Sequence, residues 1–168
     1  MAGNGDMFGP TVELAASLGI GRYVTFTGFL QGPDLDKIFR MADLYVMPSV
    51  SEPFGIAPLE ALSYNVPVII PRQSRVAEVL RHALKVDFWD IRQMADKIIS
   101  VLTRPVLGRL LRQNGAAEVR NFSWTTAGRS CLEVYRSVVS RGLESSSPRD
   151  FFCRDFDALP AAGVTGVN

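Results

Sequence analysis

Short β-branched or aliphatic runs alternate with segments of helical periodicity from Tyr23 to Val86. This alternation is typical of successive βα units, in which helices cover both faces of a parallel sheet. Strands are predicted at residues 23–27, 44–47, 66–70 and 84–86. We therefore expect an α/β fold with a Rossmann-like parallel sheet flanked by helices.

Helices are predicted before, between and after these strands, because Pro, Gly, Asn and capping residues mark their ends. Five of them cover residues 11–18, 33–41, 58–64, 75–80 and 105–120. Asp90 and Gln93 form a capping box that opens a helix ending near residue 103, and Ser123 caps a last helix ending near residue 139. We predict one lobe over residues 1–141 and a flexible, Ser-rich tail over residues 142–168.

The amino-acid composition indicates a globular domain and argues against a nucleic-acid-binding protein. The chain has 168 residues, 47% of them apolar and 21% charged, which is enough for one domain with a hydrophobic core. Lys and Arg number 18 and Asp and Glu number 17, so the net charge of +1 lacks the excess that nucleic-acid-binding proteins use. We therefore expect no nucleic-acid partner, and any phosphate site has to be local.

The sequence shows no pattern typical of targeting signals or metal-ligand sets. No apolar stretch approaches the roughly 18 residues that cross a bilayer, and the N-terminus does not resemble a secretory signal. Cys131 and Cys153 make no disulfide framework, and a single histidine, His82, excludes a multi-histidine metal site. We expect a cytoplasmic protein.

The chain opens on a Gly-rich turn, Ala2-Gly3-Asn4-Gly5-Asp6. Such a turn usually follows a buried strand in an α/β fold, yet only Met1 precedes it here. We therefore expect the sheet to be incomplete at its N-terminal end.

The loop after the second predicted strand contains the candidate ligand-binding residues. It contains Glu52 and Gly55 and enters a helix near Pro58, at the carboxyl end of a parallel strand. Ligands of open α/β sheets bind at such places, and free N–H groups at a helix start favour an anion such as phosphate. Gly55 allows close approach of a ligand, and Pro58 has no N–H, so the candidate backbone donors are Gly55, Ile56, Ala57 and Leu59.

Two glutamates bracket this loop, Glu52 within it and Glu60 in the first turn of the helix. Carboxylates accept hydrogen bonds from vicinal diols. A ligand with an anionic middle and a hydroxylated group at each end, such as a nucleotide sugar, therefore fits the pair. On spacing alone, a solvated Glu52 and a Glu60 that only favours the helix start explain the same residues.

The wider string resembles the signature of the family 4 (group 1) retaining glycosyltransferases. In that family, two glutamates separated by seven residues enclose Phe-Gly and a helix start, as Ser51-Glu52-Pro53-Phe54-Gly55 and Pro58-Leu59-Glu60-Ala61 do here. Further matches follow in order at residues 24–29, 42–49, 66–69, 77–79 and 122–124. The resemblance covers about residues 2–140.

The resemblance implies the C-terminal, donor-binding lobe of a two-lobed GT-B enzyme, which transfers a hexosyl group from a nucleotide diphosphate sugar with retention of configuration. By position, Glu52 faces the donor hexose as the catalytic residue and Glu60 binds the ribose. The backbone from Phe54 to Leu59 holds the sugar and the pyrophosphate, and the nucleobase lies near Gly28, Phe29 and Leu30. No metal or other cofactor is implied, because a helix dipole and basic side chains stabilise the leaving nucleoside diphosphate.

The resemblance also implies an N-terminally truncated chain. The acceptor-binding lobe of the family is then a missing partner, as are the Arg and Lys that pair with the pyrophosphate, and the isolated chain is expected to be inactive. Arg72 and Arg75, after the third predicted strand, either supply a replacement cation or obstruct the pocket. An alternative function stays open, a non-catalytic gene fragment or a module that binds nucleotide sugar or a partner without turnover. The full-length enzyme is either purely cytoplasmic or peripheral to the inner membrane.

Other candidate residues have simpler interpretations. Asp34 and Asp36 resemble a metal-binding Asp-x-Asp pair, but residues two apart do not share a helix face, and acids favour a helix start. Asp155 and Asp157 lie in the predicted tail. We interpret His82 as a surface histidine, because no Gly-x-Ser-x-Gly nucleophile elbow accompanies it.

Overall fold

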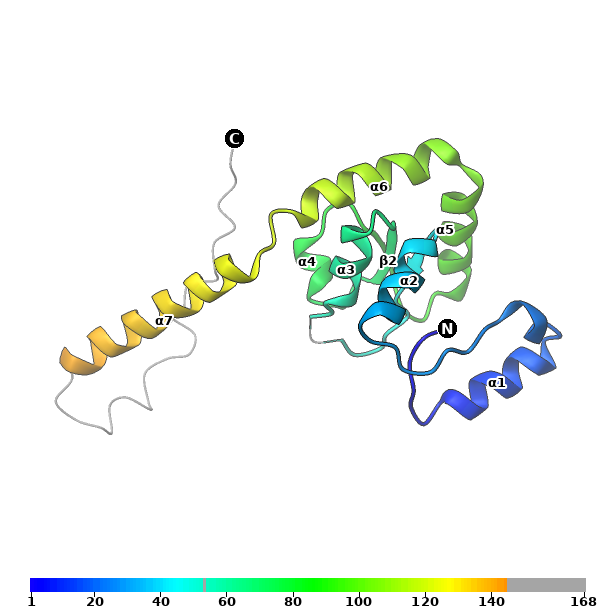
Figure 1. The fold of residues 1–168 in the computed structure, drawn as a ribbon, viewed down its shortest axis with the longest axis horizontal. Helices are drawn as coiled ribbons and strands as arrows, with labels where there is room; N and C mark the ends of the chain where they lie inside the picture. The colour runs from blue at the N-terminus through cyan, green and yellow to red at the C-terminus, as the bar shows by residue number, and fades with distance from the viewer. Residues whose placement is uncertain (53, 145–168) are drawn as a thin grey trace. The chain divides into compact units, whose positions relative to one another are not determined.

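The structure is a computed structural model that describes residues 1–52 and 54–144 (Figure 1). Contacts divide the chain into two compact units, the first being Met1–Asn121 and the second beginning at Phe122. The predicted boundary at residue 141 stays a prediction, because nearly all of the predicted tail lies outside the described residues. Within the described part of the chain, no helix combines the length and the apolar character needed to cross a membrane.

A parallel sheet forms the centre of the first unit. Its strands are β1 (Tyr45–Val46), β2 (Val68–Pro71) and β3 (Leu84–Val86), in the order β1-β2-β3. Tyr45 lies opposite Val68, and Ile69 lies opposite Leu84. The predicted α/β fold with a parallel sheet is confirmed, and three of the four predicted strands are present.

The helices lie close to their predicted positions. The structure gives α2 (Pro33–Met41), α3 (Ala57–Ser63), α4 (Val76–Val79), α5 (Ile91–Thr103), α6 (Pro105–Val119) and α7 (Trp124–Glu144). The Asp90 carboxylate accepts a hydrogen bond of 2.8 Å from the Gln93 N–H, and the Ser123 hydroxyl accepts one of 3.1 Å from the Thr126 N–H. Both predicted N-caps are therefore confirmed. The reciprocal half of the capping box is not formed, because the Asp90 N–H donates to the Asp87 carbonyl at 2.9 Å instead of to Gln93.

The first helix begins earlier than predicted. Helix α1 spans Phe8–Ser17 and so includes Pro10 at its third position. The first four N–H groups of a helix have no acceptor inside it, so a proline there removes no hydrogen bond. Pro10 is therefore compatible with a helix that begins at Phe8, three residues before the predicted start at Thr11.

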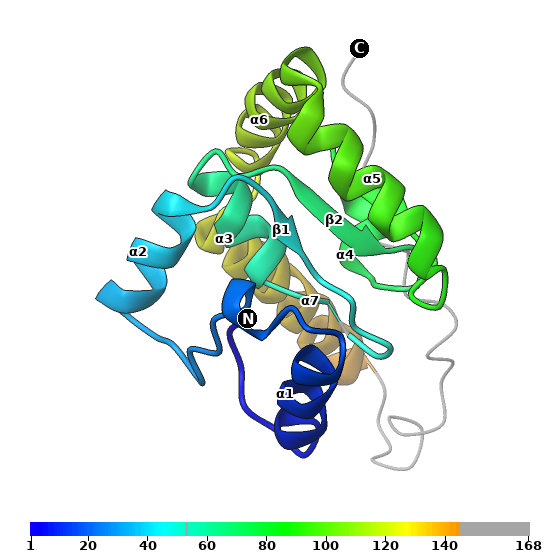
Figure 2. The same cartoon turned by 90° about the vertical axis from the view of Figure 1, so that its right-hand side faces the viewer.

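Helices cover the sheet from two sides, with α3 on one side of the strands and α5 on the other (Figure 2). All four residues of β2 are buried, and Leu62 of α3 and Leu80 after α4 are fully buried in the same core. Helix α6 packs closely on α3, since a Cβ atom on Gly115 would lie 2.4 Å from the Leu62 side chain. This packing fixes the helix that carries Glu60.

The predicted strand at residues 23–27 is not a strand of this sheet. Residues Gly21–Tyr23 form a 3-10 turn, η1. Within the part of the chain that the structure describes, the backbone partners of the extended segment after η1 are the first residues of the chain. The Thr27 N–H donates to the Met1 carbonyl at 3.0 Å, and the Gly3 N–H donates to the Gly28 carbonyl at 2.7 Å. Because only Met1 to Gly3 face it, the pairing amounts to one isolated parallel bridge, Ala2 to Gly28.

The second unit contains helix α7, described here by itself. Its hydrophobic side chains include Leu132, Tyr135 and Val139, all of which are exposed. Cys131, also in this helix, is an exposed free thiol. Cys153, Asp155 and Asp157 lie outside the described residues.

Candidate functional site

The motif loop leaves the carboxyl end of β1 and enters α3, as predicted. The Met47 N–H still donates to the Ile69 carbonyl at 2.9 Å, and the chain then turns away from the sheet. The Phe54 carbonyl accepts a hydrogen bond of 3.2 Å from the Val76 N–H at the start of α4. The loop after β1 and the helix after β2 therefore meet at one edge of the sheet.

Gly55 is required by the turn into α3. Its φ of +85° lies in the left-handed region, and a Cβ atom there would lie 3.1 Å from the Glu52 Cγ. The Met47 side chain, buried in the core, is 3.4 Å from the same point. Gly55 thus allows the stem of Glu52 to lie against the turn.

The start of α3 presents backbone donors. The N–H groups of Leu59 and Glu60 both donate to the Ile56 carbonyl, at 2.9 and 3.1 Å, so the predicted donor at Leu59 is already engaged. Among the described residues, no backbone acceptor pairs with the N–H groups of Gly55, Ile56 or Ala57. These three remain as candidate donors to an anion.

The charges of Glu52 and Glu60 both influence the pKa of Tyr45. Burial raises the pKa of Tyr45 above its usual value of 10.0, and the negative charges of Glu52 and Glu60 raise it further. Glu60 is exposed and Glu52 is partly exposed, so both carboxylates are accessible to a ligand. Both predicted glutamates lie in the segment that follows β1, Glu52 in the loop and Glu60 in α3, and a cleft between them stays a prediction.

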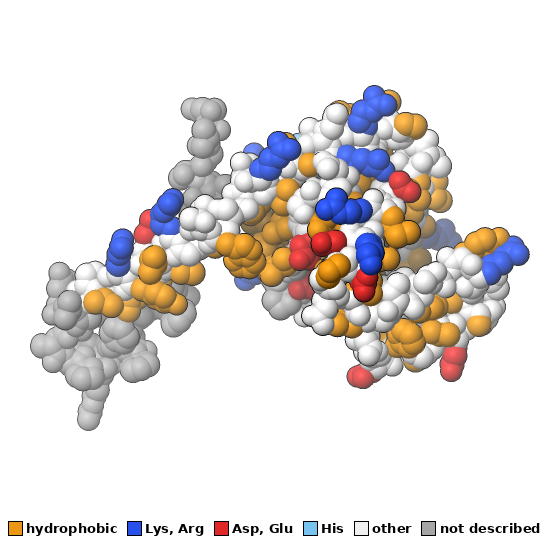
Figure 3. All heavy atoms as spheres, in the orientation of Figure 1, with side chains coloured by type: hydrophobic (Ala, Val, Ile, Leu, Met, Phe, Trp, Pro, Cys, Tyr) orange, Lys and Arg blue, Asp and Glu red, His pale blue; other side chains and the backbone are white. Residues whose placement is uncertain are grey.

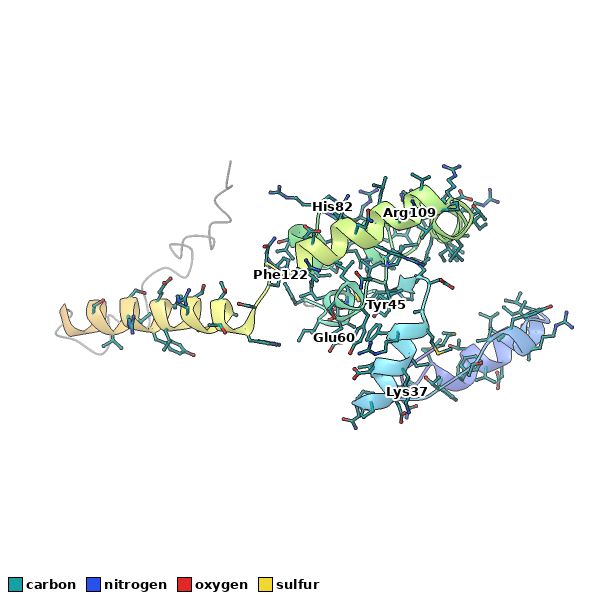
Figure 4. All side chains as sticks on the ribbon, turned by 45° about the horizontal axis from the view of Figure 1, so that its top comes forward. Lys37, Tyr45, Glu60, His82, Arg109 and Phe122 are labelled. Carbon is teal, nitrogen blue, oxygen red and sulfur yellow. The ribbon has the colours of Figure 1, made fainter. Side chains whose placement is uncertain are left out.

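Sequence reasoning did not single out Tyr45. In a predicted strand, an aromatic residue is most simply a core residue, and nothing in the pattern indicates that two carboxylates influence its ionisation. Its ring packs against Phe39 of α2, with the ring centres 5.9 Å apart. Figure 4 labels Tyr45 on β1 and Glu60 on α3.

A second tyrosine lies at the end of α3. The Tyr64 hydroxyl donates to the Asp36 carboxylate at 2.6 Å, and the Tyr64 ring stacks on Phe39 at 5.6 Å. The Arg40 guanidinium lies 5.2 Å from the centre of the same ring. Accepting this hydrogen bond, Asp36 raises the pKa of Tyr64, and burial and the charge of Asp36 add to the effect. These contacts join α2 to α3.

The arginines after β2 have acidic partners. The Arg72 Nε lies 3.8 Å from the Asp87 carboxylate, and the exposed Arg75 lies 3.7 Å from Glu78. Gln73 also donates to Asp87, at 2.8 Å. Each guanidinium group thus has a carboxylate alongside, and whether either arginine replaces the pyrophosphate cations or obstructs a pocket stays open.

The remaining candidates are distributed over the first unit. Gly28 has a φ of +69° and bridges to Ala2, and the Phe29 side chain is exposed, while Leu30 is partly buried. The nucleobase role of these three residues stays a prediction. Asp34 pairs with Lys37 at 2.8 Å, and Asp36 pairs with Tyr64, so the two acids have separate partners.

His82 and Ser74 do not form a nucleophile and base. His82 is exposed, and the buried Ser74 hydroxyl donates to the Pro71 carbonyl at 2.8 Å.

A hollow of about 180 Å³ lies beside the Gly-rich turn at the start of the chain. It is lined by Phe8, Phe26 and residues 1–5 among others. None of the motif residues lines this hollow.

The sequence profile of the family described as "Glycosyl transferases group 1" matches residues 1–118. The chain belongs to this family. Among curated relatives, an uncharacterized glycosyltransferase of Methanocaldococcus jannaschii is 31% identical over 144 residues, 83% of this chain and 37% of the relative. The D-inositol 3-phosphate glycosyltransferase of Salinispora arenicola is 34% identical over 139 residues, 80% of this chain and 31% of the relative. The chain thus spans about a third of the length of these glycosyltransferases.

Solved structures agree with this family membership. Sucrose-phosphate synthase from Thermosynechococcus elongatus superposes with a TM-score of 0.70 at 27% identity, over 78% of this chain and 34% of that one. The HepE protein of Anabaena in complex with UDP-glucose superposes with a TM-score of 0.73 at 19% identity, over 81% and 40%. These likenesses confirm that the fold is that of a part of a GT-B glycosyltransferase.

Proposed function

We propose that this chain is the donor-binding part of a glycosyltransferase that moves a hexosyl group from a nucleoside diphosphate sugar to an acceptor, with retention of configuration. One observation carries the proposal. The stem of Glu52 lies against the turn at Gly55, and Glu60 stands in the first turn of α3. Between them in the sequence, the N–H groups of Gly55, Ile56 and Ala57 have no backbone acceptor among the described residues. Carboxylates bind diols and backbone N–H groups bind phosphate, which is the chemistry of a nucleotide sugar.

Each group has a role in this proposal. Glu60 accepts hydrogen bonds from the ribose diol, and the N–H groups of Gly55, Ile56 and Ala57 bind the diphosphate. Glu52 faces the hexose as the catalytic residue and stabilises charge that develops during transfer. Donor binding needs no divalent metal, because backbone donors and the partial positive charge of the α3 start face the diphosphate.

Transfer itself requires more than this chain. The chain spans about a third of its relatives, and an acceptor has to be held within reach of the donor for reaction. We expect the isolated chain to bind a nucleoside diphosphate weakly and to form no product. Its cytoplasmic location, expected from the sequence, stays a prediction.

A binding titration tests the proposal. UDP is the first probe, because it is bound in a structure of the same fold, and GDP and ADP follow as probes of the base. Titration by NMR or calorimetry, with EDTA present, is expected to give weak saturable binding by at least one of the three. Glu60→Gln is expected to weaken it at least tenfold, since a hydrogen bond to a charged group contributes about 1.5–3 kcal/mol.

The matched control is Glu13→Gln, which removes the same charge from an exposed position in α1. Its affinity should equal that of the wild-type chain. Equal losses in both variants would indicate a general charge effect and contradict the site. Absence of binding by all three nucleotides, or sugar transfer by the purified chain above a Glu52→Ala control, would contradict the proposed function as stated.

A further inference from the structure

The proposed donor site brings like charges together. Glu52 and Glu60 are both acidic, and among the described residues no salt bridge includes either of them. A nucleoside diphosphate is negative as well, and the backbone N–H groups of the motif loop carry only partial positive charge. A full positive charge within reach of the diphosphate would therefore strengthen the binding of this ligand in particular.

The backbone places Arg75 next to the motif loop. The N–H of Val76, the following residue, donates to the Phe54 carbonyl at 3.2 Å, and that carbonyl precedes the Gly55 nitrogen in the chain. Through the bonds on either side of this contact, the Arg75 Cα lies within about 8 Å of the Gly55 nitrogen. A long arginine side chain and a hydrogen bond of ordinary length together bridge that distance to a phosphate bound by the loop.

The Arg75 guanidinium is held only loosely in the free chain. Its side chain is 72% exposed, and its Nη1 lies 3.7 Å from a carboxylate oxygen of Glu78, whose side chain is 66% exposed. An ion pair between two exposed side chains contributes little, because water screens both charges. Arg75 can therefore exchange Glu78 for a diphosphate at small cost.

Arg72 differs from Arg75 in what its backbone and side chain contact. The Arg72 N–H donates to the Val86 carbonyl of β3 at 3.0 Å. Its Nε lies 3.8 Å from the Asp87 carboxylate, which also accepts a hydrogen bond of 2.8 Å from Gln73. Arg72 is thus attached to the end of β3 and the residue after it, whereas the residue after Arg75 is attached to the motif loop.

We propose that Arg75 binds the diphosphate of the nucleotide sugar, its guanidinium donating to phosphate oxygens held by the N–H groups of the motif loop. This inference rests on the proposed function and assigns Arg75 the role of a cation rather than that of an obstruction. A guanidinium donates two parallel hydrogen bonds to one phosphate, which a point charge cannot do. Arg75 therefore adds to the affinity for the diphosphate group.

The first test is a UDP titration of Arg75→Gln and Arg75→Lys, with circular dichroism as a check that each variant is folded. Arg75→Gln is expected to weaken UDP binding about threefold to tenfold, and Arg75→Lys less, because lysine keeps the charge. Added salt should weaken binding less steeply in Arg75→Gln than in the wild-type chain. Unchanged affinity in Arg75→Gln overturns the inference, and so does tighter binding, which would mean that Arg75 obstructs the site.

The matched control is Arg72→Gln, which removes the same charge three residues earlier and should leave UDP affinity close to that of the wild-type chain. Equal losses in Arg72→Gln and Arg75→Gln would indicate a general charge effect and overturn the inference.

The Glu78 partner gives a second test with the opposite sign. Glu78→Gln releases Arg75 and should strengthen UDP binding up to about threefold. Because this gain acts through Arg75, it should disappear when Glu78→Gln is combined with Arg75→Gln. A gain of the same size in both backgrounds would come from the removed charge alone and would overturn the inference.

The outcomes separate the two proposals. Failure of UDP, GDP and ADP to bind the wild-type chain overturns the proposed function, and the role of Arg75 with it. Binding by the wild-type chain that Arg75→Gln leaves unchanged overturns the role of Arg75 alone.

Discussion

The first unit has two regions, residues 1–32 and residues 33–121, in which helical and extended segments alternate in the same way. The two regions differ in how many of their hydrophobic side chains are buried. Among the described residues of that unit, every buried hydrophobic side chain except Ala15 lies in residues 33–121. In residues 1–32, Leu14, Leu18 and Phe29 are 57%, 61% and 71% exposed, and hydrophobic side chains lie on the surface of α1 (Figure 3). The helical pattern alone therefore does not produce burial.

The difference follows from the strands. In residues 33–121, β2 pairs with a strand on each side, and α3 and α5 bury their apolar faces against it. In residues 1–32, the extended segment finds one bridge, and α1 is attached through contacts such as the edge-on pair of Phe8 and Phe26 at 5.7 Å. A sheet of several paired strands is thus what gives a neighbouring helix a surface to cover, and the motif loop lies in the part that has one.

The largest expected difference between the regions concerns leucine truncation. Leu62→Ala removes a fully buried side chain from the contact of α3 with α6 and should lower the free energy of unfolding by about 2–5 kcal/mol. Leu14→Ala, in exposed α1, should change it by less than about 0.5 kcal/mol. Urea denaturation followed by circular dichroism measures both. Similar losses in the two variants would contradict the comparison.

Glycine-to-alanine changes in the two regions should change the free energy of unfolding in opposite directions. Gly115→Ala places a methyl group against Leu62 in the core and should destabilise the fold by about 1–3 kcal/mol. Gly9→Ala, in α1 with open space around it, should stabilise the chain by up to about 1 kcal/mol through helix propensity. The same denaturation measurement applies. If Leu62→Ala restores stability to the Gly115→Ala variant, the loss in Gly115→Ala comes from contact of the added methyl group with the Leu62 side chain.

Two left-handed glycines separate backbone strain from crowding. Gly28→Ala, with a φ of +69° and open space, should cost about 1 kcal/mol from strain alone. Gly55→Ala has the same kind of strain and also displaces the Glu52 stem, so it should cost about 1 kcal/mol more and weaken UDP binding. Equal stability and equal UDP affinity of the two variants would mean that the turn at Gly55 does not position Glu52.

The smallest expected effect is a pH dependence within residues 33–121. Tyr45 has a pKa above that of an unfolded tyrosine, so the unfolded chain loses this proton first as the pH rises. The stability linked to Tyr45 is therefore complete below pH 10 and is lost as the pH rises through its folded pKa. Denaturation curves near and above pH 10 should fall more steeply for the wild-type chain than for Tyr45→Phe, and parallel curves would contradict the placement of Tyr45.

Local signals in the sequence predicted much of the fold. The bounds of α2 follow from Pro33 at its start, and the capping residues Asp90 and Ser123 mark the starts of α5 and α7. The pattern at residues 23–27 was also a valid strand signal, but a strand needs a partner, and pairing is a property of the chain as a whole. The sequence therefore predicted an extended segment without showing whether it would join the sheet.

For the candidate site, the sequence likewise predicted the local positions of the residues but not their contacts. The motif placed Glu52, Gly55 and Glu60 at the carboxyl end of β1, as found. Two further features were not predicted, namely the Leu59 N–H engaged with the Ile56 carbonyl and the approach of the Glu52 stem to Gly55. The first depends on where α3 begins, which the sequence placed one residue late, and the second depends on side-chain packing that no spacing rule reports.

The central claim is that a nucleoside diphosphate binds at the start of α3, in the well-packed part of the molecule. The most direct measurement is a UDP titration of the uniformly labelled chain followed through its backbone amide NMR signals. We expect saturable shifts at Gly55, Ile56 and Ala57, with α1 and α7 unaffected, and loss of these shifts in Glu60→Gln. Shifts confined to the hollow beside the Gly-rich turn, or scattered over the chain without saturation, would contradict the claim.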